Sequence, residues 1–222
     1  MNELQMFPDP PSKLPVPGVV ILGRFQPFHK GHEFMLEFAE RWRQSNHPEL
    51  SLIIAIGSSN RPESLRNPWS YQEREEMISH WVESNDFEIV PEIISIPDID
   101  DPPNWVSHAE SYHGEAGIFL SSDIDSLELY SKSNWPVVEI PMEERDRLEG
   151  WRVRETARMM STIDDASAVS EVLSPTIPES VVIFMIENGY LRRLAFLGEG
   201  GCLLYTSPSP RDLSTSRMPS SA

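Results

Sequence analysis

Residues 18–32 read GVVILGRFQPFHKGH, and this stretch decides the fold. The apolar run at 19–22 ends at Gly23, which is typical of a buried β-strand. Apolar residues between Phe34 and Trp42 then recur at helical spacing, so the loop that begins at Gly23 leads into a helix. In a parallel α/β sheet such a loop lies at the carboxyl ends of the strands, where these proteins bind their ligands.

The residues of this loop suit a phosphate ligand. A helix start offers free backbone N–H groups and the positive end of the helix dipole. His29 and His32 are spaced to lie on the same face of the first helical turn. Gly31 leaves room for a phosphate to approach the backbone, while Arg24 and Lys30 supply positive charge. Two histidines at a helix start can also simply cap the helix, but their convergence with glycine and basic residues favours phosphate binding.

Strand and helix signals alternate through the rest of the chain. Short apolar runs predict four further strands, at 50–56, 87–96, 117–120 and 137–140. Helical spacing and capping signals predict further helices at 70–81, 105–112, 125–131, 151–160 and 178–188, with Gly189 as the last stop signal. Alternation of this kind implies parallel strand pairing. We therefore predict an α/β fold, a Rossmann-like open parallel sheet with helices on both faces in a single domain.

Two end segments differ from the predicted domain at 18–198. Residues 1–17 contain five prolines, which block regular structure, so we expect an extended lead. Residues 199–222 are rich in Ser, Thr and Pro and cannot bury enough apolar surface to offset their ordering entropy. This tail continues no pattern found upstream. We expect it to be a disordered, adventitious extension without a function of its own.

The composition excludes several classes of partner. The 222 residues carry 35 acidic and 18 basic side chains, a net charge of −17, so we expect neither a nucleic-acid nor a membrane partner. No apolar run approaches the ~18 residues that span a bilayer, and the start of the chain lacks a signal-peptide pattern, which predicts a cytoplasmic protein. Cys202 is the single cysteine, so an intrachain disulfide and a cysteine-based zinc site are excluded.

Several ordered elements resemble the HxGH nucleotidyltransferase superfamily, in the version seen in archaeal-type nicotinamide-nucleotide adenylyltransferases. GRFQPFHKGH resembles the HxGH signature itself, and the similarity covers about residues 18–195. The other matching elements are IGSS at 56–59, LRNPW at 65–69, Glu73-Arg74, IPDI at 96–99 and Trp105-Val106. The resemblance implies an enzyme that joins a mononucleotide 5′-phosphate to the α-phosphorus of ATP and releases pyrophosphate, without a covalent intermediate.

The resemblance also implies which residues handle ATP. His29 and His32 would be catalytic, donating to the phosphates and stabilising the charge that develops on them. The other ATP- or phosphate-binding candidates are Gly23, Arg24, Phe25, Lys30, Gly31, Arg66 and Ser121. The cofactor would be Mg²⁺ held mainly by the ATP phosphates, because Mg²⁺ keeps waters and takes few protein ligands. No side chain is predicted to bind the metal itself.

A second phosphate motif of the family ends in an arginine aimed at the β- and γ-phosphates. EGWRVR at 149–154 is the candidate, and Arg154 would be its catalytic arginine. Trp151 stands where the family has threonine and Glu149 where it often has serine, which removes a hydroxyl donor and brings a carboxylate close. Arg152 is a candidate to compensate. The alternative for Arg154 is a solvated helix arginine.

On the acceptor side, Trp105 would stack on the cationic pyridine ring of nicotinamide mononucleotide, although a core tryptophan is the alternative. Asp98 would accept from the carboxamide or ribose, and Asn67 would fix the loop or touch substrate. The predicted reaction therefore makes NAD from ATP and nicotinamide mononucleotide, and the family also implies a homo-oligomer. Alternatives are another phosphate acceptor (nicotinate mononucleotide, phosphopantetheine or FMN) or a catalytically weakened nucleotide sensor, which Trp151 suggests.

Overall fold

The computed structural model describes residues 4–142 and 148–197. The first half contains β1 (Gly18–Gly23), α1 (Lys30–Asn46), β2 (Ser51–Ile56), α2 (Tyr71–Glu83) and β3 (Glu92–Ser95). It continues with the 3₁₀ turn η1 (Pro102–Asn104), α3 (Trp105–His113), β4 (Gly117–Ser121), α4 (Ile124–Lys132) and β5 (Val137–Glu139). The last helices are α5 (Gly150–Met160), α6 (Ala166–Leu173), α7 (Glu179–Glu187) and α8 (Arg193–Phe196). The tail predicted at 199–222 lies outside the described residues, as does Gly198.

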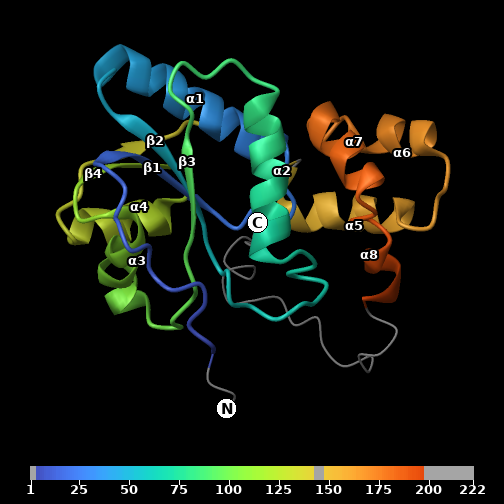
Figure 1. Ribbon diagram of the computed structural model, residues 1–222, viewed down its shortest axis with the longest axis horizontal. Helices are drawn as coiled ribbons and strands as arrows, with labels where there is room; N and C mark the ends of the chain where they lie inside the picture. The colour runs from blue at the N-terminus through green and yellow to red at the C-terminus, as the bar shows by residue number, and fades with distance from the viewer. Residues whose placement is uncertain (1–3, 143–147, 198–222) are drawn as a thin grey trace, which may run out of the picture.

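The strands form one sheet in the order β3-β2-β1-β4-β5, and every neighbouring pair is parallel. The predicted Rossmann-like parallel sheet is therefore confirmed. Chain order reverses between β1 and β4, so the crevice of this fold opens at the carboxyl ends of these two strands. The loop of residues 24–29 begins there (Figure 1).

All five predicted strands are present, but β3 is shorter than the predicted 87–96. It begins at Glu92, directly after Pro91, because proline has no N–H to donate to a ladder. The six predicted helices are also present, as α1 to α5 and α7. The sequence did not indicate η1, α6 or α8.

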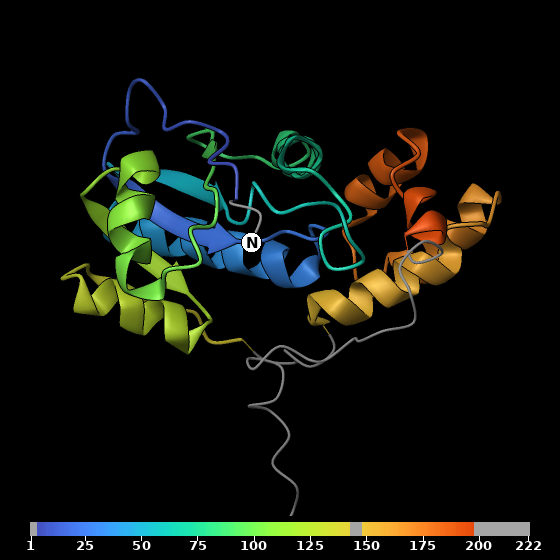
Figure 2. The ribbon, with the colours of Figure 1, turned by 90° about the horizontal axis from the view of Figure 1, so that it is seen from below.

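Alternate residues of the central strands point into two separate cores. Val19 and Ile21 pack with α1, α2 and the C-terminal helices, while Val20 packs on the opposite face with residues of α3 and α4. Helices thus cover both faces of the sheet, as predicted. Helices α5 to α8 extend the first core beyond α2, on the side away from α3 and α4 (Figures 1 and 2).

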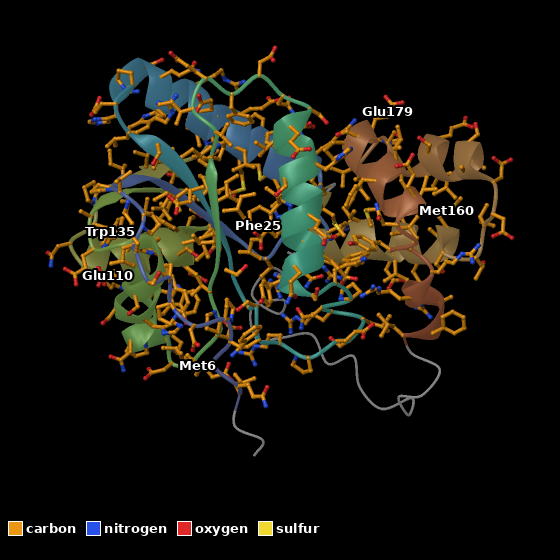
Figure 3. The ribbon with its side chains drawn as sticks, viewed as in Figure 1. Met6, Phe25, Glu110, Trp135, Met160 and Glu179 are labelled. Atoms are coloured by element: carbon orange, nitrogen blue, oxygen red, sulfur yellow. The ribbon has the colours of Figure 1, made fainter. Side chains whose placement is uncertain are left out.

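The proline-rich lead has no helix or strand over residues 4–17. Its extended backbone leaves carbonyl groups free to accept hydrogen bonds. Carbonyls within residues 5–8 accept from the side chains of Ser59, Asn60 and Tyr112, each at 3.0 Å. The lead is therefore anchored to the loop after β2 and to α3, near the carboxyl edge of the sheet, where Figure 3 labels Met6.

The last residue of α3, His113, is a buried polar residue in the core that α3 and α4 form against the sheet. His113 is fully buried; its Nδ1 lies 2.8 Å from the carbonyl of Gly114 and its Nε2 lies 2.8 Å from the hydroxyl of Tyr130. Nδ1 therefore donates to the carbonyl, and Nε2 accepts from the tyrosine. Nearby, the indole of Trp135 donates to Glu110 at 2.8 Å (Figure 3). Burial lowers the pKa of His113 to about 4.

This buried histidine predicts an acid-sensitive fold. Between pH 6.5 and about 4 the unfolded chain binds the proton and the folded chain does not, so stability falls as the pH falls through this window. The contribution of His113 amounts to about 3 kcal/mol of unfolding free energy when complete. Urea denaturation across pH 4–7.5 should show that the free energy of unfolding depends less steeply on pH in His113→Gln than in the parent. The exposed His47→Gln variant should keep the parental slope; equal slopes in all three proteins would contradict the assignment.

Candidate functional site

The loop between β1 and α1 is built around a buried aromatic ring. Phe25 has a positive φ of 50°, and its buried ring folds back over Gly23, where an added Cβ would lie only 2.9 Å from it. Glycine is required at this position by that close approach. Ser58 and Asp100, which follow β2 and β3, also have positive φ values, of 54° and 52°. Unfavourable backbone conformations thus gather at the carboxyl edge of the sheet, as is common at functional sites.

The two histidines of the HxGH signature cap α1 reciprocally. His29 is the N-cap residue, and its Nδ1 accepts from the backbone N–H of Gly31 at 3.1 Å. The backbone N–H of His29 donates in turn to Nδ1 of His32 at 3.3 Å. The rings stack with their centres 3.7 Å apart, and the ring of Phe25 lies 4.6 Å beyond His32. Both imidazoles are therefore held in fixed orientations.

This capping corrects one prediction about α1. The first four N–H groups of the helix are already bonded: Lys30 to the carbonyl of Thr176, Gly31 to the His29 ring, and the next two residues to the His29 carbonyl. They are not free for phosphate, because His29 accepts from three of them and Thr176 accepts from the fourth. Gly31 likewise makes room for the His29 ring, which lies 2.9 Å from the position of an added Cβ.

The same contacts decide which nitrogen of each histidine carries the proton. Burial, and then the charge of Arg154, lowers the pKa of His29 to about 4. The pKa of His32 is lowered well below its usual value by burial, by His29 and by Arg24. Both rings are therefore neutral at pH 7. Because each Nδ1 accepts a backbone N–H, each Nε2 carries the hydrogen, and the site presents two neutral Nε2–H donors.

The start of α5 meets the start of α1 at these histidines. A Cβ at Gly150 would lie 3.8 Å from Nε2 of His29 and 3.3 Å from Nη1 of Arg154. Arg154 also donates from Nη1 to the carbonyl of Gln26 at 2.8 Å, so it lies against the β1–α1 loop. The structure thus brings His29, His32, Arg24 and Arg154 together from two parts of the chain more than 100 residues apart.

Gln26 and Arg74 hold this loop, and neither was singled out as a site residue by sequence reasoning. The buried Gln26 amide donates to the carbonyl of Trp69 at 2.8 Å and accepts from its N–H at 3.2 Å. Arg74 donates from Nη1 to the carbonyls of Arg24 and Gly57, at 2.7 and 2.8 Å. Arg74 thereby joins the carboxyl ends of β1 and β2. The sequence drew attention to Arg74 only as part of the Glu73-Arg74 match to the family.

Asp98 lies in a separate polar group after β2 and β3. Its Oδ2 accepts from Ser58 Oγ at 2.8 Å and from Arg61 Nε at 2.7 Å, and its backbone pairs with the Asn60 amide. Arg61 also pairs with Asp100. An acceptor that used Oδ2 of Asp98 would compete with Arg61, a residue that the sequence did not single out.

The remaining predicted site residues lie at or after the carboxyl ends of β2, β3 and β4. Trp105 begins α3, half-buried, with its ring 5.8 Å from that of His108. Asn67 closes a tight turn with Ser64, and Arg66 is exposed beside it. Ser121 is buried at the end of β4, where its hydroxyl accepts from the N–H of Asp123 at 3.0 Å. That hydroxyl holds the turn into α4.

Comparison with known proteins places this arrangement in a family. Residues 20–162, from β1 to the end of α5, match the cytidylyltransferase-like family. The chain belongs to this family. A relative in Haloarcula marismortui named nicotinamide-nucleotide adenylyltransferase is 31% identical over 182 residues, which cover 82% of this chain and 87% of that protein. A relative of the same name in Pyrococcus horikoshii is 30% identical over 175 residues, which cover 79% of this chain and 86% of that protein. This cytidylyltransferase-like protein is therefore a nucleotidyltransferase, as the resemblance implied.

A solved structure supports the fold of this cytidylyltransferase-like chain. It is a bifunctional NMN adenylyltransferase/ADP ribose pyrophosphatase from Francisella tularensis, with a TM-score of 0.56 at 17% sequence identity. The match covers 80% of this chain and 51% of the other, so the chain spans about half of that protein. Across the described part of the chain, no helix is long and apolar enough to span a membrane.

Proposed function

We propose that this protein transfers the AMP group of ATP to nicotinamide mononucleotide, giving NAD and pyrophosphate. Relatives that carry this activity in their names support the choice of reaction. The observation that carries the proposal is the pair of neutral Nε2–H donors of His29 and His32, which meet Arg154 and the start of α5 at the crevice of the sheet.

This site suits direct in-line transfer. A 5′-phosphate oxygen of the mononucleotide forms a bond to the α-phosphorus, while the bond from that phosphorus to the β-phosphate oxygen breaks. Such a step needs positioning and charge stabilisation more than a protein nucleophile. His29 and His32 would donate to the oxygens on which charge develops, and Arg24, Lys30 and Arg154 would hold the triphosphate.

A divalent cation, Mg²⁺, is part of the same proposal. The Francisella tularensis neighbour was crystallised with AMP and a Mn ion. The proposed ligands are the ATP phosphates and water, because Mg²⁺ keeps waters and takes few protein ligands. Among the described residues no three His, Cys, Asp or Glu side chains gather in a group that could hold an ion. When bound, the cation would partly neutralise the phosphate charge. The chain's own arginines and Lys30 then orient the triphosphate.

The acceptor would lie over the ends of β2 and β3. Trp105 would stack on the pyridine ring, and Asp98 and Asn67 would contact the carboxamide or ribose. Arg66, exposed on the same loop as Asn67, would reach a phosphate. Ser121 would bound the adenosine side with the turn into α4. We keep the expectations of a homo-oligomer and a cytoplasmic location within this proposal, and light scattering of the purified protein tests the first.

The test is product analysis with the purified chain. Incubation with ATP, Mg²⁺ and nicotinamide mononucleotide should yield NAD on chromatography and an equal amount of pyrophosphate. Nicotinate mononucleotide, phosphopantetheine and FMN form the comparison panel. If pyrophosphate is released only with one of these other acceptors, that compound is the acceptor in place of nicotinamide mononucleotide. ATP binding without turnover on any acceptor would favour a nucleotide sensor.

Trp105 offers a specific check of the acceptor. We expect Trp105→Ala to raise KM for nicotinamide mononucleotide about 3- to 30-fold, because a stacked cationic ring contributes about 0.5–2 kcal/mol. KM for ATP should not change, and Trp105→Phe should recover most of the loss. Trp42→Ala, which removes another half-buried tryptophan at the far end of α1, serves as the control. A shift in both KM values would indicate that Trp105 is only a core residue.

A further inference from the structure

Helix α5 begins with a carboxylate beside the two histidines. Glu149 is the N-cap residue, and the next residue, Gly150, lies against His29 and Arg154. Under the proposed function, a carboxylate at this position can hinder the binding of ATP in two ways. It can bond to the N–H groups at the start of α5, or it can face the triphosphate of ATP, which it would repel.

The side chain of Glu149 takes neither option. Within the described residues it makes no capping hydrogen bond to α5. Asp123 and Asp165, at the equivalent position of α4 and α6, both cap their own helices. Oδ atoms of those residues accept backbone N–H groups at 3.0 to 3.2 Å. Something specific therefore holds the Glu149 carboxylate away from the start of α5.

Trp151 is the residue that holds it. Its indole Nε1–H donates to Oε2 of Glu149 at 2.6 Å. Arg152 approaches the same oxygen with Nε at 3.4 Å, and its guanidinium lies 4.7 Å from the centre of the Trp151 ring. The indole thus engages the carboxylate and carries the arginine that balances its charge. Trp151 is half exposed, at 51%, so core packing does not account for its place.

We propose that Trp151 is a positioning residue for ATP, which turns the Glu149 carboxylate away from the phosphate-binding start of α5. The inference rests on the proposed function. The indole N–H of Trp151 acts on ATP only through Glu149. Without that donor, the carboxylate is free to cap α5 and to place its charge at the triphosphate.

The test compares Trp151→Phe with the double variant Trp151→Phe, Glu149→Gln. Phenylalanine keeps an aromatic ring for Arg152, although a smaller one, and removes the indole N–H. We expect Trp151→Phe to weaken equilibrium binding of Mg²⁺–ATP about 10-fold, which corresponds to one misplaced charge at a partly exposed site. KM for ATP should rise equally, whereas kcat and KM for the acceptor should stay at the parental values. The double variant should bind ATP as tightly as the parent, because its residue 149 carries no charge.

Two controls keep the outcomes separate. Glu149→Gln alone should bind ATP at least as well as the parent, and thermal unfolding should match in all variants. Unchanged ATP binding in Trp151→Phe, or no recovery in the double variant, would overturn the inference. If ATP binding responds as expected but no acceptor yields NAD, the proposed reaction fails and the inference stands. A parent chain that binds no ATP would overturn both.

Discussion

Replacing His32 with alanine is expected to lower kcat for NAD formation about 100- to 1000-fold, with a smaller effect on KM for ATP. Loss of one preorganised donor to the developing charge costs about 2.7–4 kcal/mol of barrier. Under the proposed function His32 would be such a donor, because its ring is neutral and its Nδ1 already accepts from the backbone N–H of His29. Its hydrogen therefore lies on Nε2 before any substrate arrives, so no proton has to move first. Steady-state kinetics with both substrates measures the loss.

A second substitution separates the donor from the packing of the ring. His32→Phe keeps an aromatic ring between His29 and Phe25 but has no nitrogen to donate. We expect the same loss of kcat from His32→Phe as from His32→Ala. His80→Phe is a matched control, since His80 of α2 stacks on Phe184 of α7 at a ring distance of 4.9 Å, away from the proposed chemistry. Activity of His32→Phe within about threefold of the parent would refute the donor role.

The fold was predictable because its signals are local. Each strand is a short apolar run, and each of the six predicted helices carries spacing or capping residues within its own sequence. Helix α6 was missed although Asp165 caps it and its buried residues Val169 and Leu173 stand at helical spacing, because it is only eight residues long. Local sequence thus determines elements of ordinary length, while short helices depend on what they pack against.

The site was predictable only in part, because its contacts join distant residues. The sequence pattern predicted His29, His32 and Arg154 as site residues, yet the hydrogen bond that brings Arg154 to Gln26 spans 128 residues. Arg61 was not singled out, since its partner Asp98 lies 37 residues away. The expectation of free N–H groups at α1 was wrong for a different reason. The spacing of His29 and His32 suits phosphate binding and a capping box equally, and coordinates are needed to show that the same rings serve as caps.

Arg74→Met is expected to lower the free energy of unfolding by about 3–5 kcal/mol, the largest effect on stability that we predict. Arg74 is 1% exposed and donates to the backbone carbonyls of Arg24, Gly57, Ser58 and Ser70. Methionine fills a similar volume but removes the side-chain donor of the Arg24 and Gly57 carbonyls, whereas the carbonyls of Ser58 and Ser70 keep a backbone N–H. An unsatisfied buried group costs about 1–3 kcal/mol. Urea denaturation at pH 7 measures the loss.

Replacing the buried, charged Arg74 should cost more stability than replacing an exposed arginine. Burial, followed by the nearby charge of Arg24, lowers the pKa of Arg74 to about 10, so the guanidinium is still charged at pH 7 and depends on the four carbonyls for its solvation. Arg41→Met is the control, because Arg41 is exposed and pairs only with Glu37 one turn away at 3.4 Å; it should cost less than about 1 kcal/mol. Arg74→Lys keeps the charge but has no planar fork to reach several carbonyls, so it should lose most of the same stability. If Arg74→Lys were as stable as the parent, charge alone would be what holds the ends of β1 and β2 together. A loss in both variants would show that the guanidinium geometry holds the two loops on which the proposed ATP and acceptor sites depend.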